Sequence, residues 1–507
     1  MVTLGGDSNG VRLTNVRIRA NPFVNLDPDY RKPAFSYNAL GAALVLAGTN
    51  FAVNGCDIYS AGYGISTDAS GSNWLAATSL SIDRPSFGVI SGNMIKAGNN
   101  KLFLDGVSQL VLEHNKFGGA GVMAGGVGLA TYGRTAYMAQ VWMAHNHFED
   151  SYGMDREVMT FDQPAWTAST YLGPGLFGTS SSSDGQDRSE SSVRILPSTA
   201  PGHARGHAPN YKLPVVGGVM VLMNGSHEGD WRRVVSSREN AVDNSTSFEL
   251  DRPFDSSSSG MPSDGSWLQI STFKGQCILY HNSFADAGPL NFWGHAIDNI
   301  VAENHAARIY GMYGTGIFEP WQPESKDANA NQLPQPGSIL LNLHNTFRDN
   351  VITDTNEIIH RMFSCRQLAT DSDCHHLPNH VNSPNGRHAF AIVGQVGCIA
   401  SCGDLTHLTS PNRFTTMQNN TLQGRGGFLI SSEPPSRATD PQGRSYGCPG
   451  GITDVLMQGN RQVVMRAEQQ QLPIGEGFYS PVGYEAAGVL QMDNAIVTSN
   501  KAAGLAT

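Results

Sequence analysis

Acidic and basic side chains are unusually dense in one stretch of this 507-residue chain, Val141 to Asp162. Charged residues make up 15% of the chain, yet the second half of the stretch contains Asp155, Arg156 and Glu157 as well as Asp162. Paired carboxylates can supply the acid and the base, or the nucleophile, of glycoside hydrolysis. A neighbouring Arg can orient a carboxylate on a substrate. These four residues are therefore the first candidate catalytic groups.

A second group of candidates lies between residues 291 and 321. His295 and Tyr310 have side chains that can act as base and acid when a uronate sugar loses its C5 proton, which is the lyase reaction. In that reaction an Arg, or a divalent cation such as Ca²⁺, neutralises the sugar carboxylate. No other cofactor is indicated, and no metal-binding residues are assigned. The side chains that can bind sugar complete this group: Trp293, Asp298, Arg308, Tyr313 and Trp321.

The acidic stretch admits more than one role. In a hydrolase, Asp155 and Glu157 would do the acid–base work, and Arg156 and Arg308 would orient the substrate. In the competing interpretation, Asp155, Arg156 and Glu157 are salt-bridged turn residues with no catalytic role. The sequence leaves hydrolysis, β-elimination and this structural role open.

A recurring motif indicates which elements position these candidates. It is a short apolar run, often followed by His, Gly or Glu, and then by Asn, any residue and an apolar residue. Copies centre on Asn93, Asn115, Asn146, Asn282, Asn304, Asn345 and Asn420, with weaker copies at Asn54, Asn460 and Asn500. Two of the spacings, Asn93 to Asn115 and Asn282 to Asn304, are both 22 residues. A unit of this length, repeated with insertions, indicates a solenoid.

The apolar runs before each Asn favour strands, because they are short and rich in Val, Ile and Leu. The 57 glycines and 26 prolines predict frequent turns. Asn tolerates the left-handed conformation and can hydrogen-bond to an equivalent Asn along the axis. We therefore expect Asn115, Asn146 and Asn282 to stack as a buried ladder at one turn. A β-sandwich or barrel with Asn in hairpin turns is the alternative, but the Asn-Gly turns that would mark it are scarce.

This pattern resembles the right-handed parallel β-helix proteins of the pectate-lyase-like superfamily. The resemblance covers most of residues 10–172 and 275–505. It implies an all-β chain folded as a right-handed parallel β-helix. That superfamily includes polysaccharide lyases, glycoside hydrolases, epimerases, phage tailspikes and adhesins, so the fold alone does not decide the activity.

The repeat is interrupted once, which predicts three segments. It stops near Gly173 and resumes at Gly275, and Ser- and Gly-rich linkers lie at 178–192 and 258–266. Alternating apolar residues at Val219, Val221 and Met223 predict antiparallel strands between the linkers. We expect β-helix over 1–172, an inserted antiparallel β-barrel-like module over 173–274, and β-helix again over 275–507.

The interruption makes the coils of Asn146 and Asn282 expected neighbours. Glu157 lies 11 residues after Asn146, and Trp293 lies 11 residues after Asn282. Equal offsets predict that the two candidate groups share one sheet face. They would form a groove whose wall is the inserted module.

Composition narrows the function classes. The net charge of −10 argues against sequence-independent nucleic-acid binding, which needs a basic field. The sequence contains no run of 18 apolar residues, so no membrane span is predicted. The first twenty residues contain no apolar signal-peptide core. We expect a processed or trimmed form of a secreted or cell-surface protein, and the oligomeric state is left open.

The cysteines divide into two sets. Cys56 and Cys277 lie in strand-like runs and are expected to be buried thiols. The other five lie between residues 365 and 448, several of them in the loop-rich region 362–412. Disulfides suit that region in an oxidising compartment. A zinc site that uses Cys374, His375, Cys398 and Cys402 is the alternative, but its spacing matches no familiar zinc ribbon.

These patterns together predict an enzyme that cleaves a polysaccharide, expected to be acidic, in a groove beside the insertion. The alternatives are a non-catalytic glycan-binding or adhesin-like β-helix, with Trp293 and Trp321 as platforms for sugar rings, and a tailspike-like protein.

Overall fold

In the computed structural model, every element among the described residues is a β-strand. The structure describes residues 2–4, 8–20, 42–60, 62–67, 86–97, 100–104, 106–119, 125–128, 137–149, 158–162, 169–177, 191–195, 216–240, 242, 245–254, 262, 265–271, 273–293, 295–309, 311–319, 338–355, 389–396, 410–423, 428–433, 452–463, 484–487, 492–493, 496–498 and 501–503. Within these residues, no helix is both long enough and apolar enough to cross a membrane. The all-β class predicted from the sequence is confirmed.

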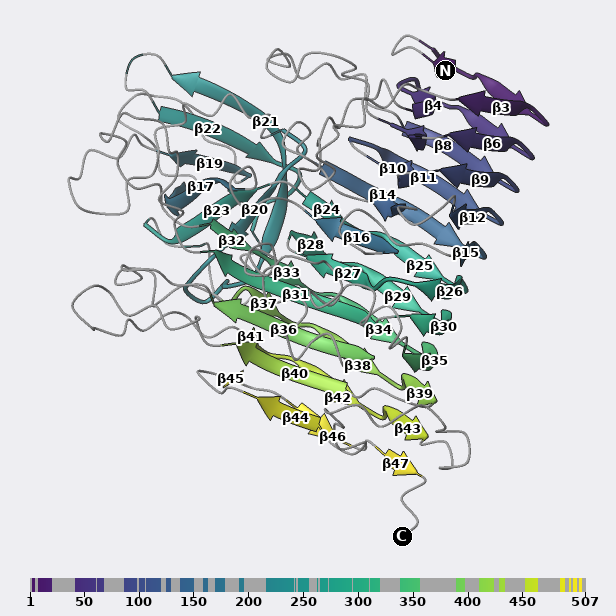
Figure 1. Ribbon diagram of the computed structural model, residues 1–507. Helices are drawn as coiled ribbons and strands as arrows, with labels where there is room; N and C mark the ends of the chain where they lie inside the picture. The colour runs from purple at the N-terminus through teal and green to yellow at the C-terminus, as the bar shows by residue number, and fades with distance from the viewer. Residues whose placement is uncertain are drawn as a thin grey trace, which may run out of the picture.

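Three parallel sheets, here named A, B and C, make up most of the molecule. The chain visits them in turn, so the coils stack from the N-terminus to the C-terminus (Figure 1). Sheet A contains β1 (Val2–Leu4), β4 (Ala42–Leu46), β7 (Tyr63–Ser66), β10 (Asn100–Phe103), β13 (Gly125–Gly128), β16 (Met159–Asp162), β27 (Leu290–Trp293), β31 (Met312–Glu319), β36 (Phe390–Val396), β40 (Phe428–Glu433) and β44 (Tyr484–Ala487); β32 (Ser338–Leu340) pairs antiparallel with β31. Sheet C contains β3 (Arg17–Ala20), β6 (Asp57–Ser60), β9 (Met94–Ala97), β12 (Lys116–Gly119), β15 (His147–Glu149), β26 (Ser283–Ala287), β30 (His305–Ile309), β35 (Val351–Thr355), β39 (Thr421–Gln423), β43 (Arg461–Val463) and β47 (Lys501–Ala503).

Sheet B changes character halfway along the stack. Its first strands form a single row: β2 (Arg12–Thr14), β5 (Ala52–Asn54), β8 (Ser86–Ser91), β11 (Ser108–Glu113) and β14 (Tyr137–Ala144). The long strand β14 then pairs with two short strands, β24 (Phe273–Gly275) and β25 (Ile278–Tyr280). Two rows continue from there: β28 (Ala296–Ile297), β33 (Asn342–Leu343), β37 (Asn412–Arg413), β41 (Ile452–Thr453) and β45 (Met492–Asp493) beside β29 (Ile300–Ala302), β34 (Thr346–Arg348), β38 (Thr416–Gln418), β42 (Leu456–Gln458) and β46 (Ile496–Thr498).

The space between the three sheets is filled by apolar side chains. Strand residues alternate between the two faces, so every second residue points inward. Like side chains stack from coil to coil: the ring centroids of Phe117 and Phe148 are 4.7 Å apart, and those of Phe148 and Phe284 are 4.9 Å apart. Cys56 and Cys277 are buried free thiols, as predicted. The five later cysteines lie outside the described residues.

The predicted asparagine ladder is confirmed at the turn between sheets B and C. Asn115, Asn146 and Asn282 are each 1% exposed. Asn115 Nδ2 donates to Asn146 Oδ1 at 3.0 Å, and Asn146 Nδ2 donates to Asn282 Oδ1 at 3.0 Å. Each amide also donates to a main-chain carbonyl, as Asn146 does to Leu112 O at 2.9 Å. The buried amides are therefore satisfied, which makes their burial favourable.

The left-handed residue at this turn is not the ladder Asn, as the sequence suggested, but the residue before it. His114, His145 and His281 have φ of 55°, 54° and 52°. That conformation turns the chain sharply and leaves the ladder Asn free to point inward. The side chain before each Asn therefore points into solvent.

One expected ladder member, Asn345, is placed differently. Asn304 Nδ2 donates to Asn350 Oδ1 at 2.9 Å, so Asn350 and not Asn345 continues the ladder. Asn345 belongs to a second, shorter ladder in the other row of sheet B, where it accepts from Asn299 Nδ2 at 2.9 Å. Both turns follow an apolar run, and the motif does not distinguish them.

At the N-terminal end the expected copy at Asn54 is also displaced. Asn54 is the last residue of β5, and Cys56 takes the ladder position. The Cys56 N–H donates to Asn93 Oδ1 at 2.8 Å, so the main chain replaces a side-chain amide there.

The interruption of the repeat is an inserted antiparallel sheet, seen beside the coils in Figure 1. It runs from Ser169 to Ser271, where the sequence predicted a module over 173–274. Its strands are β17 (Ser169–Pro174), β18 (Leu176–Phe177), β19 (Ser192–Ile195), β20 (Val219–Leu222), β21 (Trp231–Asn240), β22 (Ser245–Leu250) and β23 (Trp267–Ser271), in the order β17-β23-β20-β21-β22-β19-β18. The two ends of this order are consecutive in the chain and separated only by Gly175, so the sheet curls back on itself. A Cβ at Gly175 would lie 2.3 Å from Leu268 Cδ2, so a larger residue at this bend would require the buried Leu268 side chain to shift.

The inserted sheet packs on sheet B through an apolar interface. Val219, Val221 and Met223 point toward the coils and share a buried cluster with Phe273 and other sheet B residues. Trp231 adds a ring contact, with its centroid 5.1 Å from that of Phe273. The insertion is therefore fixed to the coils by burial and not only by its two connections.

Candidate functional site

Five predicted site residues lie outside the described residues: Asp155, Arg156, Glu157, Tyr310 and Trp321. Their assigned roles stay predictions. Asp162, Trp293, His295, Asp298, Arg308 and Tyr313 are placed by the structure, two of them through the main chain only.

The structure brings Asp162 and Trp293 together as register partners on adjacent strands β16 and β27. The coils of Asn146 and Asn282 are thus neighbours in sheet A as well as at the ladder. The register differs from the one that equal offsets from Asn146 and Asn282 imply. Trp293 is opposite Asp162 and not opposite Glu157. The connection between sheets C and A is longer in the coil of Asn146 than in the coil of Asn282. Residues at equal distances in sequence from the two asparagines are therefore not register partners.

His295 is fully buried at the connection between sheets A and B, with an exposed fraction of 0%. Neither ring nitrogen has a hydrogen-bond partner among the described residues. Burial, with a smaller contribution from the Lys274 charge, lowers the pKa of His295 to about 3. A neutral imidazole inside the protein does not fit the predicted role of a base that faces a groove.

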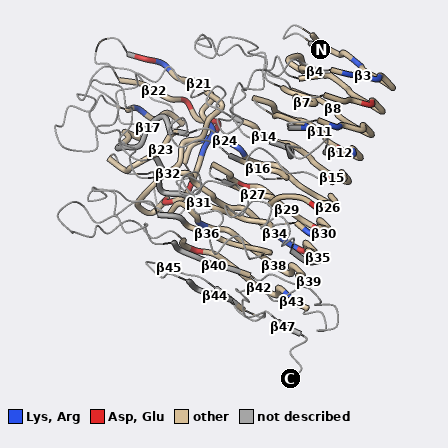
Figure 2. The backbone as a smooth tube through the Cα atoms, viewed as in Figure 1, with Lys and Arg blue, Asp and Glu red and all other residues tan. Residues whose placement is uncertain are grey.

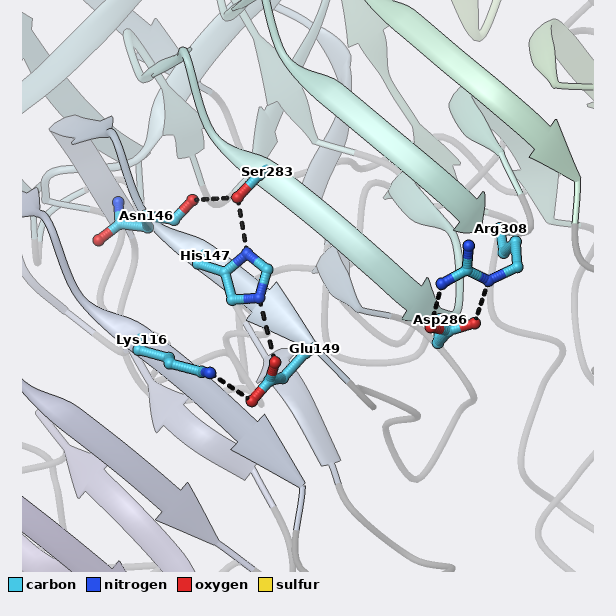
Figure 3. Close-up of polar contacts among 7 residues, drawn as sticks. All are labelled: Lys116, Asn146, His147, Glu149, Ser283, Asp286 and Arg308. Carbon is cyan, nitrogen blue, oxygen red and sulfur yellow. Dashed lines mark hydrogen bonds and ion pairs between the residues drawn. The ribbon is translucent and has the colours of Figure 1, made fainter. Parts of the chain in front are cut away.

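The remaining predicted residues are spread over different surfaces. Tyr313 is 4% exposed in β31, whereas Asp298 is exposed at a left-handed turn with φ of 59°. Arg308 lies on the outer surface of β30, where its Nε and Nη2 donate to the two carboxylate oxygens of Asp286 at 2.6 and 2.5 Å (Figure 3). The structure therefore does not gather these residues and His295 into one groove.

A site that sequence reasoning missed lies on the outer face of sheet B. Trp142 and Tyr280 come from neighbouring coils, are half-buried, and have ring centroids 5.8 Å apart. Trp142 Nε1 donates to Glu113 Oε1 at 2.7 Å, and the Tyr280 hydroxyl donates to Glu303 Oε2 at 3.3 Å. The register partner of Tyr280 on the Trp142 coil is Ala144, whose small side chain lets the rings approach. We name Glu113, Trp142, Tyr280 and Glu303 the aromatic strip.

An imidazole stack borders the aromatic strip. The rings of His114 and His145 are 5.1 Å apart with planes 7° from parallel, and those of His145 and His281 are 5.5 Å apart and 17° from parallel. At its end, His281 Nε2 lies 2.9 Å from Glu303 Oε2. The left-handed turn before each ladder Asn holds these rings outward and in line. In the recurring motif these three histidines directly precede Asn115, Asn146 and Asn282.

A polar network follows on the other side of the ladder, on sheet C (Figure 3). His147 Nδ1 is 2.7 Å from Ser283 Oγ, and His147 Nε2 is 3.1 Å from Glu149 Oε2. Lys116 Nζ lies 2.9 Å from Glu149 Oε1. The coil strands are mostly tan in Figure 2, with short blue and red segments.

Two pKa shifts describe the electrostatics of these surfaces. The hydrogen bond from Lys116, and then that from His147, holds the pKa of Glu149 below its usual value. Desolvation and then the Glu303 carboxylate raise the pKa of Tyr280. Glu149 is therefore an acceptor for its neighbours, and the Tyr280 hydroxyl stays protonated and donates to Glu303.

Within the described part of the chain, no group of three or more His, Cys, Asp or Glu residues is arranged to hold a metal ion. The aromatic strip and the polar network each have paired or hydrogen-bonded carboxylates. The divalent cation considered from the sequence therefore stays a prediction.

No family model and no curated protein matches the chain. A solved alginate lyase from Paenibacillus sp. str. FPU-7 is 7% identical with a TM-score of 0.31, over 89% of this chain and 95% of that one. A mannuronic acid specific polysaccharide family 6 lyase from human gut microbiota is 11% identical with a TM-score of 0.31, over 84% of this chain and 67% of that one. At these values the activity has to be argued from the site itself.

Proposed function

We propose that the chain is a right-handed parallel β-helix that binds a polysaccharide and cleaves it, by β-elimination or by glycoside hydrolysis. The observation that carries this proposal is the aromatic strip, in which Trp142 and Tyr280 lie side by side between Glu113 and Glu303. Aromatic faces pack against sugar rings, and carboxylates bind sugar hydroxyls.

The strip suits a polymer because it repeats with the coils. Adjacent coils are spaced about 4.8 Å apart, as paired strands are. A linear glycan that lies along the coil axis meets Glu113, Trp142, Tyr280 and Glu303 in that order. The imidazole stack beside it adds His145 and its neighbours as further donors and acceptors. This surface offers contacts to several sugar units at once.

The strip is a binding surface and not a pair of hydrolytic carboxylates. Glu113 and Glu303 are three coils apart, which is about 14 Å along the axis. Glycosidases use carboxylate pairs about 5–9.5 Å apart. Cleavage therefore stays assigned to the predicted catalytic residues other than the buried His295. Among them, Asp162 is the register partner of Trp293. An acidic polymer and a secreted or cell-surface location remain part of this proposal.

The test is incubation of the purified protein with a panel of neutral and acidic polysaccharides. New ultraviolet absorbance from an unsaturated sugar identifies β-elimination, and new reducing ends without that absorbance identify hydrolysis. Retention on an immobilised glycan without either product supports the non-catalytic alternative. The absence of both cleavage and retention across the panel would sink the proposal.

The strip itself is tested by Trp142→Ala and Tyr280→Ala on the glycan that binds best. Val89→Ala is the matched control, because Val89 lies in the same outward row of sheet B, two coils before Trp142. Both aromatic variants are expected to weaken binding and the control is not.

A further inference from the structure

We propose that Ser283, His147 and Glu149 form a nucleophilic site on sheet C that hydrolyses acyl esters. This activity is separate from cleavage of the polymer chain. Ser283 Oγ is 2.7 Å from His147 Nδ1, and His147 Nε2 is 3.1 Å from Glu149 Oε2. A hydroxyl, a base and a group that orients the base are thus in line within hydrogen-bond reach.

The protonation of the imidazole follows from its partners. The Glu149 carboxylate is ionised and can only accept, because Lys116 and His147 lower its pKa. His147 Nε2 therefore carries a proton and donates it to Glu149. In the neutral imidazole Nδ1 is then the acceptor, so the Ser283 hydroxyl donates to Nδ1. This is the tautomer in which His147 can remove the proton from Ser283.

A competing contact of Ser283 is weaker. Its Oγ also lies 3.5 Å from the main-chain oxygen of Asn146, a much longer distance than the 2.7 Å to His147. The Asn146 oxygen already accepts from the Ser283 N–H at 2.8 Å. Figure 3 shows both contacts of the hydroxyl, and the much shorter one directs it to the imidazole.

Both strands are fixed, so the geometry is preorganised. His147 and Ser283 are register partners in β15 and β26, and the neighbouring ladder residues Asn146 and Asn282 are hydrogen-bonded to each other. Inward, Phe148 and Phe284 stack directly beneath them. The inward phenylalanine stack and the neighbouring asparagine ladder fix the two strands, which keeps the nucleophile and its base in register.

The reaction is a double displacement. Ser283 Oγ forms a bond to the ester carbonyl carbon while its proton moves to His147 Nδ1. The carbon–oxygen bond to the alcohol breaks, and the proton passes to the departing oxygen. Water then attacks the acyl-serine, gives a proton to Nδ1, and releases the carboxylic acid as Ser283 recovers its proton. His305, the register partner of Ser283 on the next coil, can supply an N–H to the oxyanion.

The substrate class follows from exposure. The side chains of His147 and Glu149 are 39% and 32% exposed, on the outer face of a sheet. A site on an open face fits an ester that projects from a large or polymeric molecule, such as an acylated sugar hydroxyl. That last identification rests on the proposed polysaccharide function, whereas ester cleavage itself does not.

The experiment uses a fluorophosphonate probe, which labels activated serines covalently, with peptide mass spectrometry to locate the label. The wild-type protein is expected to be labelled on Ser283. Ser283→Ala should abolish that label, and His147→Gln should slow it about 100-fold or more, as expected for loss of a general base. Exposed imidazoles can hydrolyse activated esters by themselves, so turnover of p-nitrophenyl acetate alone does not decide the matter. A burst of p-nitrophenol that disappears in Ser283→Ala supports the acyl-serine.

Thr421→Ala is the matched control. Thr421 lies in the same outward column of sheet C as Ser283, and its register partners Val351 and Arg461 have no imidazole. This variant should keep full labelling of Ser283. Unlabelled wild-type protein, or equal labelling rates in the wild type and His147→Gln, would overturn the proposal whatever the polysaccharide panel shows. Melting temperatures of all variants establish that each one is folded.

Discussion

Asn146 and Asn282 are 136 residues apart in the sequence, yet Asn146 Nδ2 donates a hydrogen bond of 3.0 Å to Asn282 Oδ1. The whole inserted sheet lies between them in the chain. The ladder therefore passes the insertion without a gap, and the coils on either side pair as if they were consecutive. The stretch around Asn146 is thus continuous in space with the stretch around Asn282, although not in sequence.

Replacement of Asn146 tests the energetic weight of this junction. Asn146→Ala removes the acceptor of two buried donors on Asn115, its Nδ2 and its main-chain N–H. It also removes one of the two donors to Asn282 Oδ1, which keeps the Asn146 main-chain N–H. We expect the free energy of unfolding to fall by about 1–3 kcal/mol, measured by chemical denaturation. Gln418→Ala is the control, because that half-exposed amide makes only a 3.4 Å contact with Gln458. Equal stability of the wild type and Asn146→Ala would contradict the ladder's role.

The aromatic strip predicts a specific loss of glycan binding. Trp142→Ala removes one of two adjacent rings and the indole donor to Glu113. We expect affinity for the best-binding glycan to fall roughly tenfold, on the scale of a single aromatic contact. Isothermal titration with oligosaccharides of increasing length measures this. If affinity is unchanged in Trp142→Ala and in Tyr280→Ala, the glycan binds elsewhere.

The buried His295 predicts a pH dependence of stability. Its pKa is about 3 in the folded protein, against an ordinary value of 6.5. The folded state therefore binds fewer protons than the unfolded state at acidic pH. The stability from this group is complete above about pH 6.5 and is lost as pH falls toward 3, by about 1.4 kcal/mol for each unit.

His295→Leu should flatten this dependence, because an apolar side chain leaves nothing to titrate and no unpaired ring nitrogens. His305→Leu, at an exposed position, is the control and should keep the wild-type slope. The measurement is denaturant unfolding between pH 4 and pH 7, with pH values chosen around the ordinary imidazole pKa of about 6.5. Parallel curves for the wild type and His295→Leu would show that His295 does not contribute.

The ladder was predictable because it depends on one residue type at a fixed place. The ladder positions, such as Asn115 and Asn146, recur as Asn in the sequence because few side chains can both donate and accept along an axis. At two positions the recurring Asn does not identify the ladder correctly. Asn345 follows an apolar run, as the ladder asparagines do, but belongs to a second ladder. At Cys56 the main-chain N–H donates to Asn93 in place of a side-chain amide. Which turn an Asn belongs to is decided by pairing across coils.

The candidate site was less predictable for a related reason. Register in sheet A depends on how many residues each coil spends between sheets, so counting from Asn146 and Asn282 gave the wrong partner for Trp293. His295 shows the second limit, because its type suggests catalysis while its place is in the core. Conversely, Trp142 and Tyr280 are far apart in the sequence because the inserted sheet lies between them in the chain. The pairing of β14 with β25 brings them together.

Glu157 gives the last prediction, since its role is still the one inferred from the sequence. If Glu157 is the catalytic acid or base, Glu157→Gln should keep the fold and lose roughly 100-fold or more in rate. If Glu157 is the salt-bridge partner of a neighbouring Arg, the same change should lower the melting temperature and leave turnover per folded molecule intact. Both quantities are measured on one preparation with the polysaccharide that the panel identifies.

The control for Glu157 is Glu239→Gln, which removes an exposed carboxylate of strand β21 in the inserted sheet. It should change neither rate nor melting temperature beyond the small effect of a surface substitution, about 0.5 kcal/mol. A rate loss confined to Glu157→Gln assigns the chemistry to the stretch that precedes β16, beside the strand pair of Asp162 and Trp293. Unchanged turnover in Glu157→Gln removes that residue from the mechanism. Asp162→Asn is then the next variant to measure, because Asp162 is the only predicted catalytic carboxylate that the described strands place opposite a predicted sugar-binding residue.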